Sequence, residues 1–443
     1  MENNYISFRS ILFMITTIII FLFRDGLGYS VPLFLILTVI LISLLFLNVK
    51  ELVYFYLFLI PLSVGNILYF VNAVFGLIFI VKFYKEINVK NTFIVGTILI
   101  LWEALHLIPS VFLGFDENIV KLFGFSICLI VTIVIITSEK LHLNFIPLIF
   151  SWSLGLASLC GILFLKYANQ YGLSNLTSSI RRFGYMSSQF DTSSTSLLIN
   201  PNTLGKLVFL TVFCLLTVLV FEKKFRFLIS FLIFYFIIFG IFTGSRSFLL
   251  ISIILLIIYT IEMVIKIRKN IKVLLTMIIT SLIIIFFVTN NMQDTLEMFS
   301  ARIESDNITG SRDKIYKEYT DTLINSPNII YGVGMQEYVT KYNAINNNIV
   351  SSSHNVFIEV IAIWGLLGMI IVCSLFITLY KSMKIKRNLI YKSFLPFLPL
   401  FGLFLSAQFG QFFISYYDTF PTLILTFINI KYADSKLREE KDL

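Results

Sequence analysis

Long apolar runs constrain this chain more than any other feature. Many of them reach about 17–23 residues, the length that a helix needs to cross the hydrocarbon core of a bilayer. The 443 residues are 58% hydrophobic but only 13% charged, whereas soluble domains average about 25% charged residues. A soluble core of this size could not cover its surface with so few charges. The sequence therefore excludes a soluble enzyme and predicts an all-α polytopic membrane protein.

Hydropathy predicts about 14 transmembrane helices in a single transmembrane domain, residues 1–443. The count falls to about 12 if the two shortest, 52–64 and 419–430, are re-entrant or broken helices. The predicted spans are 10–23, 31–49, 52–64, 66–82, 92–113, 118–137, 145–166, 197–221, 227–243, 247–265, 273–290, 356–379, 394–416 and 419–430.

Basic residues set the expected orientation. The chain carries a net charge of +9, and many of its Lys and Arg residues gather in the connections 222–226, 266–272 and 381–392. All three connections fall on one side of the predicted bundle, which the positive-inside rule makes the cytoplasm. Both termini are expected on the same side. The basic balance then reflects membrane topology and not a nucleic-acid partner.

Two long loops are expected on the opposite, outer face, at 168–196 and 291–355. Loops of this length usually carry function or are disordered. The second is expected to fold as a helical cap, because Ile315, Tyr319 and Leu323 recur at helical spacing. A Gly-Val-Gly turn follows that helix.

Side chains that could carry chemistry concentrate at the expected outer helix ends. His354 closes the second loop, where a histidine can accept a proton from a hydroxyl near neutral pH. Asn355 and Glu359, one helical turn apart, are expected to line the mouth below it. Asn202, within Asn-Pro-Asn at a helix start, is a further lining residue by the same reasoning. The alternative is that His354 merely belongs to the helix start, with Asn355 and the Asn-Pro-Asn residues as ordinary caps.

Four arginines on the expected outer face run against the positive-inside bias: Arg181, Arg182, Arg246 and Arg312. Guanidinium groups bind phosphate oxygens bidentately and keep their charge, so these arginines predict a phosphate-binding site. The prediction is strongest for Arg246, which has no acid nearby in sequence. The alternative is interfacial snorkelling or a pair with an acid, such as Asp313 beside Arg312.

Glu103 and His106 lie one turn apart inside the span 92–113. Ionisable groups are costly there and usually mark a functional site, so a structural pair and a proton path are both open. The outer loops contain no Asp-x-Asp pair, and the chain has no phosphate-loop motif and no Cys/His cluster with zinc spacing. The sequence therefore predicts no metal and no cofactor.

The order of these outer motifs resembles a known superfamily, that of O-antigen ligases and Wzy-type polysaccharide polymerases. The resemblance covers roughly residues 197–380. Its pieces are, in chain order, Asn-Pro-Asn (200–202), Thr-Gly-Ser-Arg (243–246), Ser-Arg before the loop helix (311–312), Gly-Val-Gly (332–334), Ser-His-Asn-Val-Phe-Ile-Glu (353–359) and Trp-Gly-Leu-Leu-Gly (364–368).

The resemblance implies a GT-C-like glycosyltransferase of the bacterial plasma membrane. It implies that a sugar chain on undecaprenyl diphosphate is transferred at the outer face without a metal. The family's catalytic histidine corresponds to His354 and its arginines to Arg246 and Arg312, whereas Arg181 and Arg182 match only loosely. The implied partners are lipid-linked oligosaccharide donor and acceptor, membrane lipid, a flippase and a chain-length regulator, and no nucleic acid.

A polymerase is preferred to a ligase, because the richness in Ile, Phe, Asn and Lys resembles low-GC bacteria, many of which make capsules and lack a lipid A core. Three alternatives remain open. One is a ligase that transfers the chain to another acceptor, and the second is a transporter or flippase of lipid-linked sugars. The third is a cell-wall elongation type of glycosyltransferase, which would need a catalytic acid in the second loop, such as Glu304 or Asp306.

Overall fold

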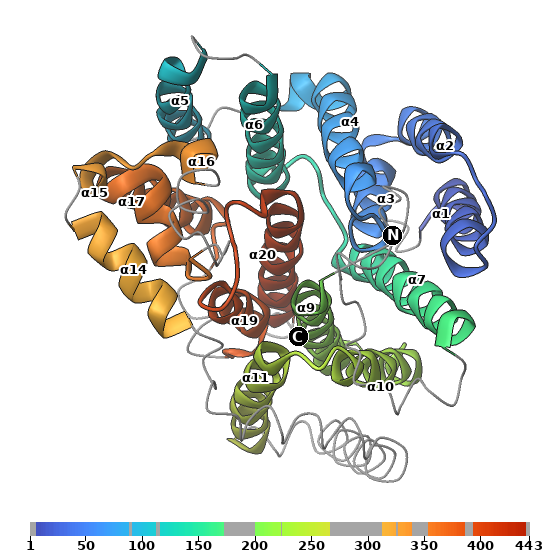
Figure 1. The fold of residues 1–443 in the computed structure, drawn as a ribbon. Coiled ribbons are helices and arrows are strands. Elements are labelled where there is room, and N and C mark those ends of the chain that lie inside the picture. The colour runs from blue at the N-terminus through green and yellow to red at the C-terminus, as the bar shows by residue number, and fades with distance from the viewer. Residues whose placement is uncertain are drawn as a thin grey trace.

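A computed structural model describes most of the chain as a bundle of helices packed side by side (Figure 1). No strand occurs in the part of the chain that it describes, which confirms the all-α prediction. The described residues are 6–87, 91–111, 116–171, 200–222, 224–265, 312–324, 327–338, 353–385 and 393–439.

The bundle helices are α1 (Phe8–Phe21), α2 (Leu33–Phe46), α3 (Val49–Leu62), α4 (Asn66–Phe83), α5 (Asn91–Val111), α6 (Asp116–Thr137), α7 (Phe145–Tyr171), α9 (Pro201–Phe221), α10 (Arg226–Phe242), α11 (Arg246–Ile265), α17 (Val356–Ser382), α19 (Leu398–Ala407) and α20 (Tyr416–Glu439). Single turns adjoin them at η1 (Leu22–Gly26), η2 (Tyr84–Glu86) and η4 (Leu395–Phe397). Among the described helices, four are long and apolar enough to cross a membrane, over Ile119–Thr137, Phe145–Asn169, Pro201–Phe221 and Val356–Ser382.

Each predicted span coincides with a helix, except 273–290, which lies outside the described residues. Two predicted boundaries are wrong. The last span is not a short piece ending at 430, because α20 continues to Glu439. Its final turns are polar, so hydropathy does not register them. The span before it stops at Ala407, well short of 416.

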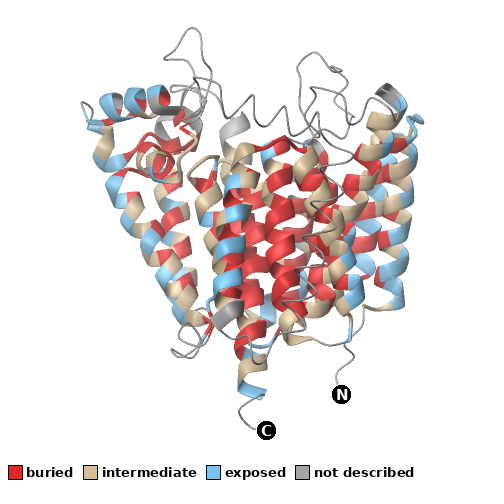
Figure 2. Cartoon of the chain, turned by 90° about the horizontal axis from the view of Figure 1, so that it is seen from below, coloured by how far each residue is buried: buried red, intermediate tan, exposed pale blue. Residues whose placement is uncertain are grey.

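Burial separates inner helices from peripheral ones. Figure 2 shows buried residues concentrated on the helices in the middle of the bundle, and α9 is buried along almost its whole length. Peripheral helices instead expose large apolar side chains, such as Phe46 on α2 and Phe227 on α10. Such exposure is costly in water, whereas lipid chains accept it. The pattern is that of a polytopic membrane protein.

The second predicted loop contains three described helices, which are called the cap below: α14 (Arg312–Ile324), α15 (Asn328–Tyr331) and α16 (Gly334–Glu337). They lie against α17 (Figure 1). The predicted apolar face is confirmed, because α14 buries the three side chains that recur at helical spacing, Ile315, Tyr319 and Leu323.

The cap meets α17 at a break in that helix. Gly365 has φ +70° and ψ −174°, a conformation that is essentially restricted to glycine. A Cβ on Gly365 would lie 2.1 Å from the Ile330 carbonyl oxygen, and one on Gly332 would lie 2.2 Å from the Ile363 oxygen. The backbone of the cap and the backbone of α17 therefore touch, and each has a glycine at the point of contact. The residues from Val356 to the break form a separate short helix.

Candidate functional site

His354 lies two residues before this short helix, next to its cap residue Asn355, in an uncommon backbone conformation. Its φ is +50°, in the left-handed region that few residues other than glycine adopt. The carbonyl of His354 accepts a hydrogen bond from Tyr316 Oη at 3.2 Å, and the same hydroxyl lies 3.0 Å from the Gln408 carbonyl oxygen. Tyr316 belongs to the first turns of α14, so the starts of α14 and α17 lie together.

The residue before His354 is also held. The Ser353 N–H donates to Tyr338 Oη at 2.9 Å, and Tyr338 Oη donates to Ser353 Oγ at 2.9 Å. Both side chains are buried. Burial, reinforced by the nearby carboxylate of Glu359, raises the pKa of Tyr338. Its hydroxyl therefore stays protonated, which this arrangement requires.

Asn355 caps α17, as one of the two interpretations of this residue predicted. Its Oδ1 accepts from Phe357 N at 3.0 Å and Ile358 N at 3.3 Å. Its Nδ2 donates to Gln408 Oε1 at 3.2 Å, which ties the start of α17 to the end of α19. Asn355 thus serves the helix start and the packing beside His354 together.

Glu359 does not line an open mouth, so that prediction is wrong. Its side chain is only 1% exposed, and its carboxylate accepts from Phe412 N at 2.8 Å and Ile414 N at 2.7 Å. A buried carboxylate needs such donors to offset its lost hydration. Glu359 therefore holds the connection 408–415, between α19 and α20, against the start of α17.

Asn202 and Arg246 lie together at the starts of α9 and α11. Ser245 Oγ donates to Asn202 Oδ1 at 2.9 Å and accepts from Phe248 N at 3.3 Å, which caps α11. Arg246 is the first residue of α11 and is half-buried. Two helix N-termini, each with a partial positive charge, thus lie together at the position of Arg246.

A buried ion pair joins this group to α20, and the sequence did not reveal it. Lys206 Nζ lies 2.9 Å from Asp418 Oδ2, and the two side chains are 11% and 8% exposed. Lys206 follows Asn202 by one turn of α9, and Asp418 lies in the first turn of α20, after the connection that Glu359 holds. A lone lysine inside an apolar span was the signal available in the sequence, but its partner lies 212 positions away.

The remaining arginines are less completely placed. Arg181 and Arg182 lie outside the described residues. Arg312 begins α14, one turn before Tyr316, so its backbone lies near the segment that contacts His354; its side chain is not described.

Glu103 and His106 of α5 contact the cap. Glu103 is buried, and its carboxylate accepts from Trp364 Nε1 at 2.7 Å and from Met335 N at 3.0 Å. His106 Nε2 lies 2.9 Å from the Tyr331 carbonyl oxygen. Both side chains of α5 therefore contact the cap, and Glu103 also contacts α17 at its break. These contacts favour a structural role for each of the two side chains over a proton path.

The contacts of Glu103 predict the effect of Glu103→Gln. An amide group presents one acceptor where the carboxylate presents two, so Trp364 N–H or Met335 N–H should face another donor. We expect a loss of about 1–3 kcal/mol of stability, measured by thermal unfolding in detergent micelles. In a Trp364→Phe background, which removes one donor, the same substitution should cost less. An equal cost in both backgrounds would contradict this account of Glu103.

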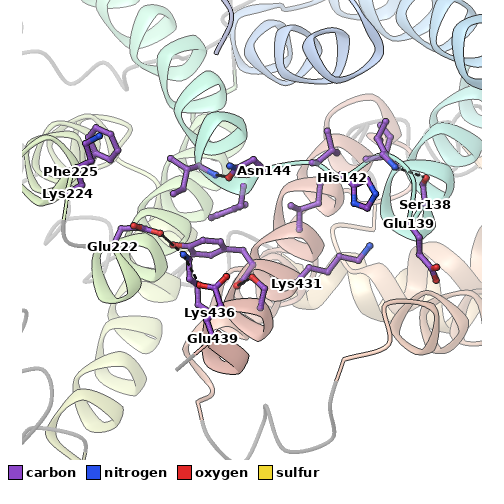
Figure 3. A pocket seen from close by; sticks show the side chains of 18 residues that line it. Ser138, Glu139, His142, Asn144, Glu222, Lys224, Phe225, Lys431, Lys436 and Glu439 are labelled. Atoms are coloured by element: carbon purple, nitrogen blue, oxygen red, sulfur yellow. Dashed lines mark hydrogen bonds and ion pairs between the residues drawn. The ribbon is translucent and has the colours of Figure 1, made fainter. Parts of the chain in front are cut away.

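A polar pocket of about 600 Å³ opens at the opposite end of the bundle. Figure 3 shows its labelled side chains, which come from the connection between α6 and α7, from the connection between α9 and α10 and from the last turns of α20. Lys436 lies 3.3 Å from Glu222 and 3.2 Å from Glu439. Three lysines and three glutamates line the pocket, so it has no formal charge excess to select an anion. Among the described residues no cluster of His, Cys, Asp and Glu could hold a metal ion.

A family match covers the part of the chain that includes His354. Residues 229–373 match the family model described as O-antigen ligase. No curated protein and no solved structure matches the chain. The matched region runs from α10 to α17 and contains Arg246, Arg312 and His354. Residues 229–373 thus carry an O-antigen ligase domain, which supports the resemblance of this membrane protein to the superfamily of O-antigen ligases and Wzy-type enzymes.

Proposed function

We propose that this protein is a polysaccharide polymerase of the bacterial plasma membrane. It transfers a growing polysaccharide from undecaprenyl diphosphate to the next lipid-linked repeat unit at the outer face. The observation that carries the proposal is His354, which lies within the O-antigen ligase domain in a left-handed backbone conformation beside the start of α14. Strained backbone conformations, such as the left-handed one at a residue other than glycine, cluster at functional sites.

The proposed reaction is a direct displacement. His354 accepts the proton of the acceptor hydroxyl as its oxygen attacks the anomeric carbon of the donor sugar. The bond between that carbon and the diphosphate oxygen breaks, and undecaprenyl diphosphate leaves with the electron pair. The anomeric centre is inverted. Because a diphosphate is a good leaving group, one base and cationic side chains suffice, and no metal is proposed.

Arg246 is proposed to hold the donor diphosphate, with Arg312 and, by resemblance only, Arg181 and Arg182. The support is the position of Arg246 at the adjoining starts of α9 and α11. Fixed donors and dipoles at this point stabilise negative charge that grows on the leaving group. Asn202 lies in the same group through its bond to Ser245.

Replacing Arg246 by lysine keeps the charge but loses the bidentate fork. A hydrogen bond to a charged group contributes about 1.5–3 kcal/mol, so we expect kcat/KM for the lipid-linked donor to fall about ten- to a hundredfold. Arg226→Lys is the matched control, because Arg226 begins α10 at the opposite end of the bundle. If both variants turned over like the unmodified protein, bidentate binding at Arg246 would be refuted.

The orientation of the bundle is part of the proposal. The connection between α9 and α10, with Lys224 and with Arg226 at its end, lies at the pocket end. The positive-inside rule assigns that end to the cytoplasm, which leaves the His354 end outside. Single cysteines placed at Tyr331 and at Glu439 should react with an impermeant thiol reagent from opposite sides of the membrane.

One reaction separates the candidate functions. The purified protein is given a lipid-linked repeat unit alone, and the products are separated by size. A ladder of products is expected for a polymerase. No product until a second acceptor is added would instead indicate a ligase, which the family match supports equally. Movement of the lipid across vesicles without new glycosidic bonds would indicate a transporter.

A further inference from the structure

We propose that Tyr338 is a positioning residue that fixes the backbone before His354 and so aims the imidazole. The inference rests on the proposed role of His354 as the base. Tyr338 directly follows α16, so this end of the cap is assigned the task of holding the base in place.

The conformation of His354 needs such support. A non-glycine residue in the left-handed region is strained, and the strain persists only where the surroundings over-determine it. Tyr338 holds Ser353, Tyr316 holds the His354 carbonyl, and Gln408 holds the Asn355 side chain. Three consecutive residues are thus each tied to a different partner, from the cap and from the end of α19.

Tyr338 makes the most specific of these contacts. Its hydroxyl accepts from the Ser353 N–H and donates to Ser353 Oγ, both at 2.9 Å. These two bonds fix the peptide plane and the side chain of Ser353 together. The phenol is 1% exposed, so water cannot take the place of either partner.

Tyr338 is itself held in place by contacts of its segment with α5 and of its ring with α14. Three residues earlier, the Met335 N–H donates to the buried Glu103 of α5. The Tyr338 ring packs against Tyr319 of α14, with ring centroids 6.0 Å apart. The hydroxyl that holds Ser353 is therefore anchored in two directions. A cap that only covered the site would not need, beside the base, a buried hydroxyl that accepts one hydrogen bond and donates another.

The first test is Tyr338→Phe, which keeps the ring and removes the hydroxyl. Misplacement of a catalytic group by about 1 Å can lower the rate a hundredfold. We expect kcat with the lipid-linked repeat unit to fall about ten- to a hundredfold, with KM unchanged. Tyr331→Phe, at an exposed cap tyrosine, should leave kcat unchanged. A Tyr338→Phe protein with normal kcat would overturn the proposal.

A second readout needs no substrate. The chain has only 3 histidines, so diethyl pyrocarbonate modification of His354 can be followed by mass spectrometry of its peptide. We expect faster modification in Tyr338→Phe than in the unmodified protein, while His142 reacts at an unchanged rate. Equal rates at His354 in both proteins would overturn the proposal even if Tyr338→Phe lost activity through reduced stability.

A double-variant cycle completes the test. If Tyr338 acts through Ser353, then Tyr338→Phe should change the His354 modification rate less in a Ser353→Ala background than in the unmodified protein. Fully additive effects would contradict the assigned route. Failure of the proposed function looks different: His354→Asn would then keep its turnover, whereas the modification rates would still report whether Tyr338 holds the segment.

Discussion

Replacing His354 by asparagine is expected to lower the rate of glycosyl transfer by about 10²–10⁴-fold, the usual contribution of a general base. Asparagine is the appropriate substitution because it adopts the left-handed region more readily than most residues. The Tyr316 and Tyr338 contacts go to the backbone of this residue and to Ser353, so they should survive. The variant therefore removes the base and leaves its support intact.

The measurement is product formation at saturating lipid-linked repeat unit, at matched amounts of folded protein. KM for the donor should change little, because its diphosphate is assigned to the arginines. His142→Asn is the matched control. His142 also has a positive φ, of 31°, but it lines the pocket at the opposite end of the bundle. Turnover of His354→Asn within a few fold of the unmodified protein would exclude the assigned base.

The helices were predictable because each of them is a continuous apolar run that can be found in the sequence alone. The helical cap was predictable for the same reason, since Ile315, Tyr319 and Leu323 repeat with helical period. The break in α17 was not predictable, although Gly365 is part of the Trp-Gly-Leu-Leu-Gly sequence. A glycine within an apolar span usually continues the helix. Only the approach of the Ile330 carbonyl, at a distant position in the chain, shows why this glycine has a positive φ.

The site divides in the same way. The positions of His354, Arg246 and Asn202 at helix starts were predictable, because polar groups at helix starts in an apolar chain are few, whereas their roles in catalysis and binding stay predictions. Glu359 was misread as a lining residue, because its partners are backbone N–H groups of a connection more than 50 positions away. Backbone donors leave no mark in a sequence. Which buried acid holds which segment is therefore a question of tertiary structure alone.

Lys206 and Asp418 provide the second large expected effect. Replacing Lys206 by methionine should destabilise the protein by about 3–5 kcal/mol, because it leaves the Asp418 carboxylate buried without its cation. The two side chains are 11% and 8% exposed, so water offers little compensation. The ion pair joins α9 to the start of α20, and thermal unfolding in detergent micelles should show a lowered midpoint.

The double variant Lys206→Met/Asp418→Leu decides whether charge is the cause. Well-packed apolar residues often replace a buried ion pair at no cost or with a gain, so the double variant should recover most of the lost stability. Thr419 Oγ1, 3.2 Å from Asp418 Oδ1, loses a single partner in this change. A double variant as unstable as Lys206→Met would show that the lysine stem, not the ion pair, stabilises this end of the bundle. Recovery would show instead that opposite charges at positions 206 and 418 offset each other's burial beside the site.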